Sequence, residues 1–211
     1  MRILFAGEYS GVGREAFRAY GHDVTSCDLL PADDNSPYHY QGDVRNILND
    51  GWDMMIAHPE CTRLTNAGVR WLHVPPAGKT LEQMWEELEE AVEFYKLLRD
   101  ARIPLKAIEN PIMHYHARER IKMGHRQVVQ PWWFGDKAFK ATGLELIGLP
   151  DLVPTNKLVP PKPGTEEHKE WSFIHRATPG KDRWKLRSKS FPGIMGAMAA
   201  QWSNLTRQEA A

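Results

Sequence analysis

Short apolar segments alternate with helix-compatible segments along the first half of the chain. Gly, Pro or Asp residues follow each apolar segment, as they do where a strand ends in a turn. Four segments are predicted strands: residues 1–6, 22–28, 52–58 and 104–110. Strands that alternate with helices predict an α/β fold with a mostly parallel sheet.

The clearest predicted helix runs from about Thr80 to Ala101. Thr80 and Gln83 have the spacing of a capping box, which satisfies backbone N–H groups at a helix start. A single apolar stripe follows at helical spacing. Its members are Leu81, Trp85, Leu88, Val92, Tyr95 and Leu98. The stripe predicts that one face of the helix packs on the sheet.

The pattern is less regular beyond residue 112. Residues 127–135 and 144–150 are predicted short strands, and five prolines between Pro150 and Pro163 predict loop or extended chain. Residues 192–205 are a predicted closing helix. Its core face would contain Ile194, Met198 and Trp202. The expected organisation is an α/β domain over 1–149, a small insertion over 150–187, and a returning helix within 188–211.

The composition is that of an ordinary globular domain. The chain has 211 residues, of which 42% are hydrophobic and 26% are charged, and no apolar run approaches the ~20 residues of a membrane span. The first residues are typical of a β-strand and not of a secretory signal. Cys27 and Cys61 are too few for a disulfide framework, so we expect a reducing, cytoplasmic setting and no membrane association.

The net charge of zero conceals a split along the chain. Residues 1–112 hold 11 Lys and Arg against 18 Asp and Glu, a balance of −7, whereas residues 113–190 hold 15 against 8, a balance of +7. A basic second half is typical of a protein that presents one face to a polyanion. Chance clustering of solvated charge is the alternative.

Residues with chemical potential follow each predicted strand. In an α/β sheet, ligands bind at the carboxyl ends of the strands. The glycine turn FAGEYSG spans 5–11, Asp28 and Asp43 follow next, Cys61 ends the tetrapeptide HPEC, and Glu109 begins ENP. An ordinary turn, solvated aspartates and a structural thiol are the alternatives. A thiol and a carboxyl at neighbouring strand ends indicate a nucleophile and an acid. Glu109 lies between an apolar strand and a proline, where burial without a partner would be costly, which favours a functional role.

These motifs, in this order, resemble those of the cytosine-C5 DNA methyltransferases, in a compact form similar to short, often phage-encoded members. FAGEYSG resembles the Phe-x-Gly-x-Gly turn that holds S-adenosylmethionine, HPEC the Pro-Cys loop of the nucleophile, and IENP the Glu-Asn motif that grips cytosine. Residues 187–202 resemble the closing motif, whose helix returns beside the first strand. The resemblance covers most of 1–112 and about 187–203.

The resemblance implies a Rossmann-like, class I S-adenosylmethionine-dependent methyltransferase fold with a small C-terminal basic insertion. Asp28 matches the acid that takes the ribose, and Asp43 the acid that contacts the adenine amine. The implied cofactor-binding residues are Phe5, Gly7, Glu8, Ser10, Gly11, Asp28, Leu29, Asp43, Val44 and Pro59.

The resemblance also implies a mechanism on a DNA substrate. The Cys61 thiolate adds to C6 of cytosine, which lets C5 attack the methyl group, and Glu109 holds the ring and supports its protonation. Loss of the C5 proton then expels the cysteine. A target base in a duplex must be flipped out of its stack. The implied substrate-binding residues are Asn110, Arg126, Gln127, Lys181 and Arg183.

The chain departs from the family pattern at three places. Glu60 intervenes between Pro59 and Cys61, and a carboxylate there is expected to raise the pKa of the thiol. Thr62 stands where the family has Gln. Residues 125–130 (HRQVVQ) lie where a Gln-x-Arg-x-Arg motif is expected but have different spacing, so Arg126 and Gln127 match it only in part.

The predicted insertion combines basic and aromatic residues, the composition that grips phosphates and stacks on bases. Its basic members are Lys157, Lys162, Lys169, Arg176, Lys181, Arg183 and Lys185, and its aromatic members are Trp171, Phe173 and Trp184. The alternative is a surface loop anchored by two tryptophans. A target-recognition region this small implies a short or loose preference for DNA sequence.

Two other functions stay open. The same cofactor could serve another pyrimidine acceptor, such as a free nucleotide, RNA or a modified base, or the chain could be a non-catalytic relative that binds the cofactor or nucleic acid. No metal is expected, because no ligand cluster of suitable spacing accompanies His114 and His116. The cytoplasm is the expected location, that of the host cell if the chain is phage-encoded.

Overall fold

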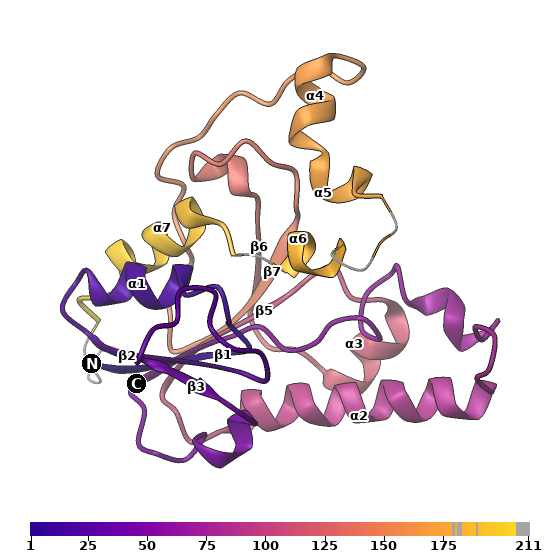
Figure 1. Ribbon diagram of the computed structural model, residues 1–211, viewed down its shortest axis with the longest axis horizontal. Coiled ribbons are helices and arrows are strands. Elements are labelled where there is room, and N and C mark those ends of the chain that lie inside the picture. Colours follow the sequence, from indigo (N-terminus) through magenta and orange to yellow (C-terminus); the bar gives the residue numbers. More distant parts are fainter. Residues whose placement is uncertain (179, 181–182, 189, 206–211) are drawn as a thin grey trace.

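The computed structural model describes residues 1–178, 180, 183–188 and 190–205. This part of the chain contains one seven-stranded sheet with the order β3-β2-β1-β4-β5-β7-β6 (Figure 1). The strands are β1 Arg2–Ala6, β2 Asp23–Asp28, β3 His39–Gln41, β4 Met54–Ala57, β5 Leu105–Asn110, β6 Arg126–Val129 and β7 Thr142–Ile147.

The sheet is parallel except at one strand. Strands β1 to β5 pair in parallel, and β7 runs antiparallel between β5 and β6. The chain moves outward from β1 to β3 and then returns to β4 on the other side of β1, which creates a topological switch point between β1 and β4. Ligands of such sheets bind beside this point. The α/β class and the Rossmann-like topology predicted from the sequence are confirmed.

Helices cover both faces of the sheet (Figure 1). One core cluster joins α1 and α7 to β1, β4, β5 and β7, and a second joins α2 and α3 to the opposite face. The helices are α1 Val12–Arg18, α2 Leu81–Asp100, α3 Tyr115–Ile121, α4 Glu166–Trp171, α5 Phe173–Arg176, α6 Arg183–Ser188 and α7 Pro192–Trp202. Short 3-10 helices are η1 Val44–Asn46, η2 Val69–Leu72 and η3 Pro131–Trp133.

Helix α2 begins as its capping box predicts. The Thr80 hydroxyl accepts from the Gln83 backbone N–H at 3.2 Å, and the Gln83 side chain accepts from the Thr80 N–H at 2.9 Å. The predicted stripe is wrong at its first member: Leu81 is exposed and Met84 is buried in its place. Met84 lies in the same first turn and packs in the core cluster beneath α2 and α3, so this turn buries a different side chain than the stripe predicts.

The closing helix packs as predicted, and one predicted strand is cut short. Ile194, Met198 and Trp202 of α7 are buried in the core that α7 shares with α1. Strand β6 ends at Val129, and η3 follows, so the expected strand over 127–135 is wrong in its second half. Pro131 has no N–H to donate to a ladder, which ends the strand. Strand β3 was not predicted.

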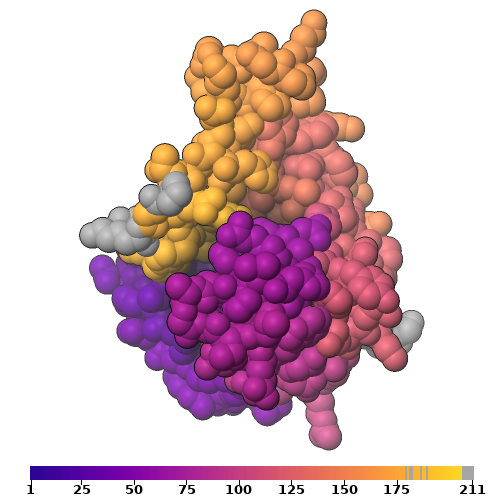
Figure 2. Space-filling model, turned by 90° about the vertical axis from the view of Figure 1, so that its right-hand side faces the viewer, coloured from indigo at the N-terminus to yellow at the C-terminus, as the bar shows by residue number. Residues whose placement is uncertain are grey.

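The segment predicted as a basic insertion has two parts. Residues 150–163 have no helix or strand, as the prolines predict, and the helices α4, α5 and α6 follow. The segment that carries α4 projects from the rest of the molecule, whereas α6 lies close to the carboxyl ends of the strands (Figures 1 and 2).

Candidate active site

The turn after β1 requires glycine at two positions. Gly7 and Gly11 have φ values of 77° and 75°, in the left-handed region that favours glycine. A Cβ on Gly7 would lie 2.5 Å from the carbonyl oxygen of His58. The turn therefore lies directly against the end of β4, at the switch point of the sheet.

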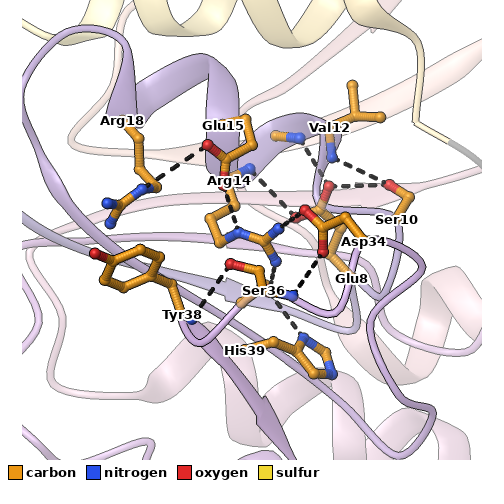
Figure 3. A network of polar contacts seen from close by, with 12 residues as sticks. Glu8, Ser10, Val12, Arg14, Glu15, Arg18, Asp34, Ser36, Tyr38 and His39 are labelled. Carbon is orange, nitrogen blue, oxygen red and sulfur yellow. Dashed lines mark hydrogen bonds and ion pairs between the residues drawn. The ribbon is translucent and has the colours of Figure 1, made fainter.

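The side chain of Glu8 closes the N-terminus of α1 (Figure 3). Its Oε1 accepts from the Gly13 N–H at 2.7 Å and from the Ser10 hydroxyl at 3.1 Å, and its Oε2 accepts from the Arg14 N–H at 3.3 Å. A carboxylate is stabilised at a helix N-terminus by the free N–H groups and by the helix dipole. These N–H groups hold phosphate in dinucleotide-binding folds, and here Glu8 uses them.

A buried arginine ties α1 to the segment after β2. The Arg14 guanidinium is fully buried, donates to the Ser26 hydroxyl at 2.6 Å, and forms ion pairs with Glu15 and Asp34 (Figure 3). Ser26 in turn contacts His39 Nδ1 at 2.8 Å. Sequence reasoning missed this network, because its members come from separate segments and share no motif.

The other residues predicted to bind a cofactor gather near the ends of β1 to β4, with differing exposure. Asp28 ends β2 and accepts from the Leu30 N–H at 3.0 Å, while the side chain of Leu29 is exposed. Asp43 begins η1, where the Arg45 backbone N–H, followed by its guanidinium, lowers the pKa of the carboxyl. Phe5, Val44 and Pro59 are buried.

The Cys61 thiol lies in a partly buried loop after β4. Burial, followed by the charge of Glu109, raises the pKa of the thiol to about 11. Glu60 raises it further but contributes less than Glu109, and the positive charges of Lys140 and Arg187 oppose the rise. The thiol is therefore protonated at neutral pH. Glu60 therefore raises the pKa of the Cys61 thiol, as the sequence predicts. The main causes of the raised pKa are burial and Glu109.

Glu109 is held by two side chains, those of Lys140 and His58, that sequence reasoning missed. Its Oε1 lies 3.8 Å from Lys140 Nζ, and its Oε2 lies 3.7 Å from His58 Nδ1. Burial alone would raise the pKa of Glu109, but Lys140, the contact with His58 and a bond from Thr142 outweigh burial and lower it to about 2. Glu109 is a carboxylate at every physiological pH. His58 precedes Pro59 in the motif HPEC and could have been found there, whereas nothing in the sequence marks Lys140.

A small cavity of about 20 Å³ adjoins Glu109, and residues between α6 and α7 close it. This volume suits one water molecule and not a pyrimidine ring. The cavity is lined by His58, Glu109, Lys140, Thr142, Leu144, Ser188, Ser190, Phe191, Ile194, Met195 and Met198.

Helix α6 also lies against the glycine turn. The Tyr9 ring is 6.0 Å from that of Trp184, and its hydroxyl is 3.1 Å from the Ser188 hydroxyl. Trp184 is 45% exposed despite this contact, so an aromatic face is available beside the turn. Arg183 begins the same helix, and Lys181 lies outside the described residues. Trp171, in contrast, is buried against Phe139 and anchors α4, as the surface-loop alternative predicts.

The structure separates the residues predicted to bind the substrate base. Glu109 pairs with Leu144, whereas Arg126 pairs with Glu145, the next residue of β7, so Glu109 and Arg126 face opposite sides of the sheet. The Gln127 side chain forms two hydrogen bonds with the backbone of Leu152, at 2.9 and 2.8 Å.

Asn110 follows Glu109 and therefore faces the other side of the sheet. Its side chain is buried, and both amide atoms are without a hydrogen-bond partner among the described residues.

The residues that the structure describes lack two features. They contain no group of three or more His, Cys, Asp or Glu side chains arranged to hold a metal ion. No helix formed by them is long and apolar enough to cross a membrane.

Comparison with known proteins finds similarity to solved structures but not to known sequences. No family model and no curated protein sequence matches the chain. Among solved structures, the chain is similar to a candidate DNA modification methyltransferase encoded within a prophage of E. coli, with 13% identity and a TM-score of 0.46. The match covers 74% of this chain and 53% of that protein, so the matched part spans about half the length of the neighbour.

Proposed function

We propose that this protein transfers a methyl group from S-adenosylmethionine to C5 of cytosine in DNA, with Cys61 as nucleophile and Glu109 as the group that holds the base. The observation that carries the proposal is the proximity of the two side chains. They come from the ends of neighbouring strands, and the charge of Glu109 acts directly on the pKa of the thiol. A thiol and a carboxylate beside a glycine turn suit addition to a pyrimidine ring.

The glycine turn favours S-adenosylmethionine over a phosphate-bearing cofactor. Glu8 already satisfies the first N–H groups of α1, so a pyrophosphate would meet a carboxylate in place of free donors. The same negative charge suits a cofactor that carries a sulfonium and an ammonium group. Asp28 and Asp43 follow in positions suited to hydroxyl and amine donors. When bound, the cofactor supplies the electrophilic methyl group.

The protonation states of the free site indicate how the residues share a proton. The Cys61 thiol carries a proton, and Glu109 does not. When Sγ bonds to C6, the ring gains a negative charge that N3 can neutralise by taking a proton. We infer that the thiol proton ends on N3, so the adduct forms without a net change of charge, and that the ionised Glu109 carboxylate accepts a hydrogen bond from the N3–H group that results. Lys140 and His58 keep Glu109 ionised.

Two observations favour a second function. The Cys61 thiol has a pKa of about 11, and the cavity beside Glu109 has a volume of only about 20 Å³. Both are expected of a non-catalytic protein that binds the cofactor or nucleic acid. In that case the chain binds its ligands without forming a covalent adduct.

The test is incubation with radiolabelled S-adenosylmethionine and double-stranded DNA, RNA or free cytidine nucleotides, followed by nucleoside mass spectrometry. We expect 5-methylcytosine in DNA only, loss of product in Cys61→Ser, and normal product in Cys27→Ser, whose thiol is buried on β2. If only RNA or only a free nucleotide is labelled, that molecule and not DNA is the methyl acceptor. Cofactor binding with no label in any acceptor would favour the binding function, and full activity of Cys61→Ser would exclude the covalent mechanism.

A further inference from the structure

The guanidinium of Arg126 is partly buried, and part of its hydrogen-bonding capacity is unmet. Its Nε and Nη2 atoms are buried and have no hydrogen-bond partner within the part of the chain that the structure describes. The carboxylate directly opposite in the sheet, that of Glu145, instead accepts from the Gly124 N–H at 2.6 Å and the Tyr95 hydroxyl at 2.8 Å. Burial of a charged group without a partner is costly, so the arrangement needs a reason outside the free fold.

The space for this guanidinium depends on a glycine. Arg126 lies over Gly143, where a Cβ would be 2.5 Å from Nε. Gly143 is also directly opposite Asn110, whose amide atoms have no partner in the described ranges. Directly opposed residues of antiparallel strands point to the same face. Two groups with unmet hydrogen bonds therefore lie beside each other on the face that α2 and α3 cover.

A groove leads to Arg126 from the surface. It has a volume of about 330 Å³ and is lined by Arg118, Glu119, Lys122, Met123, Gly124 and Arg126. Three cations against one carboxylate give the lining a formal charge of 3 − 1 = +2. Arg118 and Lys122 are exposed at the end of α3. A groove of this size and charge accommodates a phosphoryl group with part of the unit that carries it.

We propose that this groove is a phosphoryl-binding site, in which Arg126 turns toward the groove and donates through Nε and Nη2 to two oxygens of one phosphate. Arginine presents this pair of donors in the geometry that phosphate accepts. Arg118 and Lys122 add positive charge at the entrance. The source of the phosphate rests on the proposed function: if DNA is the substrate, the ligand is a phosphate of the DNA backbone. A free phosphate compound would offer the same chemistry to the groove.

The test compares two variants that remove the guanidinium from its place. Arg126→Met deletes the charge at similar length, and Gly143→Ala keeps the arginine but places a methyl group where it lies. Both should weaken duplex DNA binding by roughly tenfold and reduce the slope of log K against log salt by about one, the signature of one lost phosphate contact. Lys96→Met, at an exposed cation paired with Glu93 on α2, should leave the slope unchanged.

The melting temperature of the free protein distinguishes a ligand-binding arginine from a structural one, because the two substitutions should shift it in opposite directions. Arg126→Met should raise the melting temperature of the free protein, because an unpartnered buried charge is removed. Arg99→Met should lower it, because the Arg99 guanidinium bonds to Asp100 and to the Ile121 carbonyl.

Inorganic pyrophosphate separates the two sources of phosphate. If it raises the melting temperature of the wild type and not of Arg126→Met, a free phosphoryl group is sufficient; if only duplex DNA shows the Arg126 dependence, the ligand is the backbone. If Arg126→Met lowers the melting temperature and leaves DNA and pyrophosphate binding unchanged, the proposed phosphoryl site is wrong. If it weakens DNA binding without changing the salt slope, Arg126 contacts an uncharged group of the ligand and not a phosphate. All measurements omit S-adenosylmethionine, so failure of methyl transfer would leave this result standing.

Discussion

The two ends of the candidate site treat buried charge in opposite ways. Around the glycine turn, Glu8 and Arg14 are buried and have their hydrogen bonds supplied from within the chain. At the end of β5 and on β6, the buried Asn110 and the partly buried Arg126 have buried polar atoms that no described residue satisfies. A satisfied polar network makes a region rigid and specific, whereas an unsatisfied one is costly until a ligand completes it. The first region is built in advance, and the second depends on its ligand.

The largest expected effect comes from applying one substitution to both arginines. Arg14→Met should lower the free energy of unfolding by about 2 kcal/mol, because it removes the buried hydrogen bond to the Ser26 hydroxyl and the attraction to Glu15 and Asp34, which are themselves partly exposed. Arg126→Met should raise it. Urea unfolding of the two variants measures both changes. Equal destabilisation by both variants would remove the distinction between the two regions.

Acid sensitivity should concentrate at Glu109. Its folded pKa of about 2 lies below its ordinary value of 4.5, so the folded carboxylate is stabilised above about pH 4.5 and this contribution is lost as the pH falls toward 2. Glu109→Gln lacks this term, so the stability difference between wild type and variant should narrow steadily between those pH values. Urea midpoints at a series of pH values measure it, and parallel curves would contradict the ionised state of Glu109.

The reactivity of Cys61 should respond to its charged neighbours in opposite directions. Glu109→Gln should lower the pKa of the thiol by about one unit, and so raise its alkylation rate near neutral pH about tenfold. Lys140→Met should raise the pKa and slow alkylation, whereas Lys140→Arg should preserve the wild-type rate. Iodoacetamide rates against pH, measured in a Cys27→Ser background, report this without any methyl transfer. A rate unaffected by both Glu109→Gln and Lys140→Met would exclude electrostatic contact between these groups.

The smallest expected effect concerns Glu60. This residue is exposed and contributes less to the pKa of the Cys61 thiol than burial or Glu109. Glu60→Gln should therefore accelerate alkylation of Cys61 only a few-fold, by well under one pKa unit. If Glu60→Gln matched Glu109→Gln, the departure of HPEC from the family pattern would be the main control of the nucleophile.

The sequence alone determined the features that depend on local chemistry. The alternation of apolar strands and amphipathic helices predicted the α/β sheet, and Thr80 and Gln83 predicted the start of α2. The placement of Cys61 and Glu109 at neighbouring strand ends followed from the parallel order of strands. Periodicity, caps and turns act over a few residues, so a single sequence contains them in full.

The tertiary structure alone decided which charges meet. Lys140 reaches Glu109 from a segment 31 residues later (140 − 109), and Arg14 and Arg126 differ only in what the folded chain places around them. The sheet register also placed Asn110 opposite Gly143, over which the Arg126 side chain lies. Coulomb energy and desolvation depend on distance and burial in space. Residues far apart in sequence acquire those distances only when the sheet and its covering helices assemble.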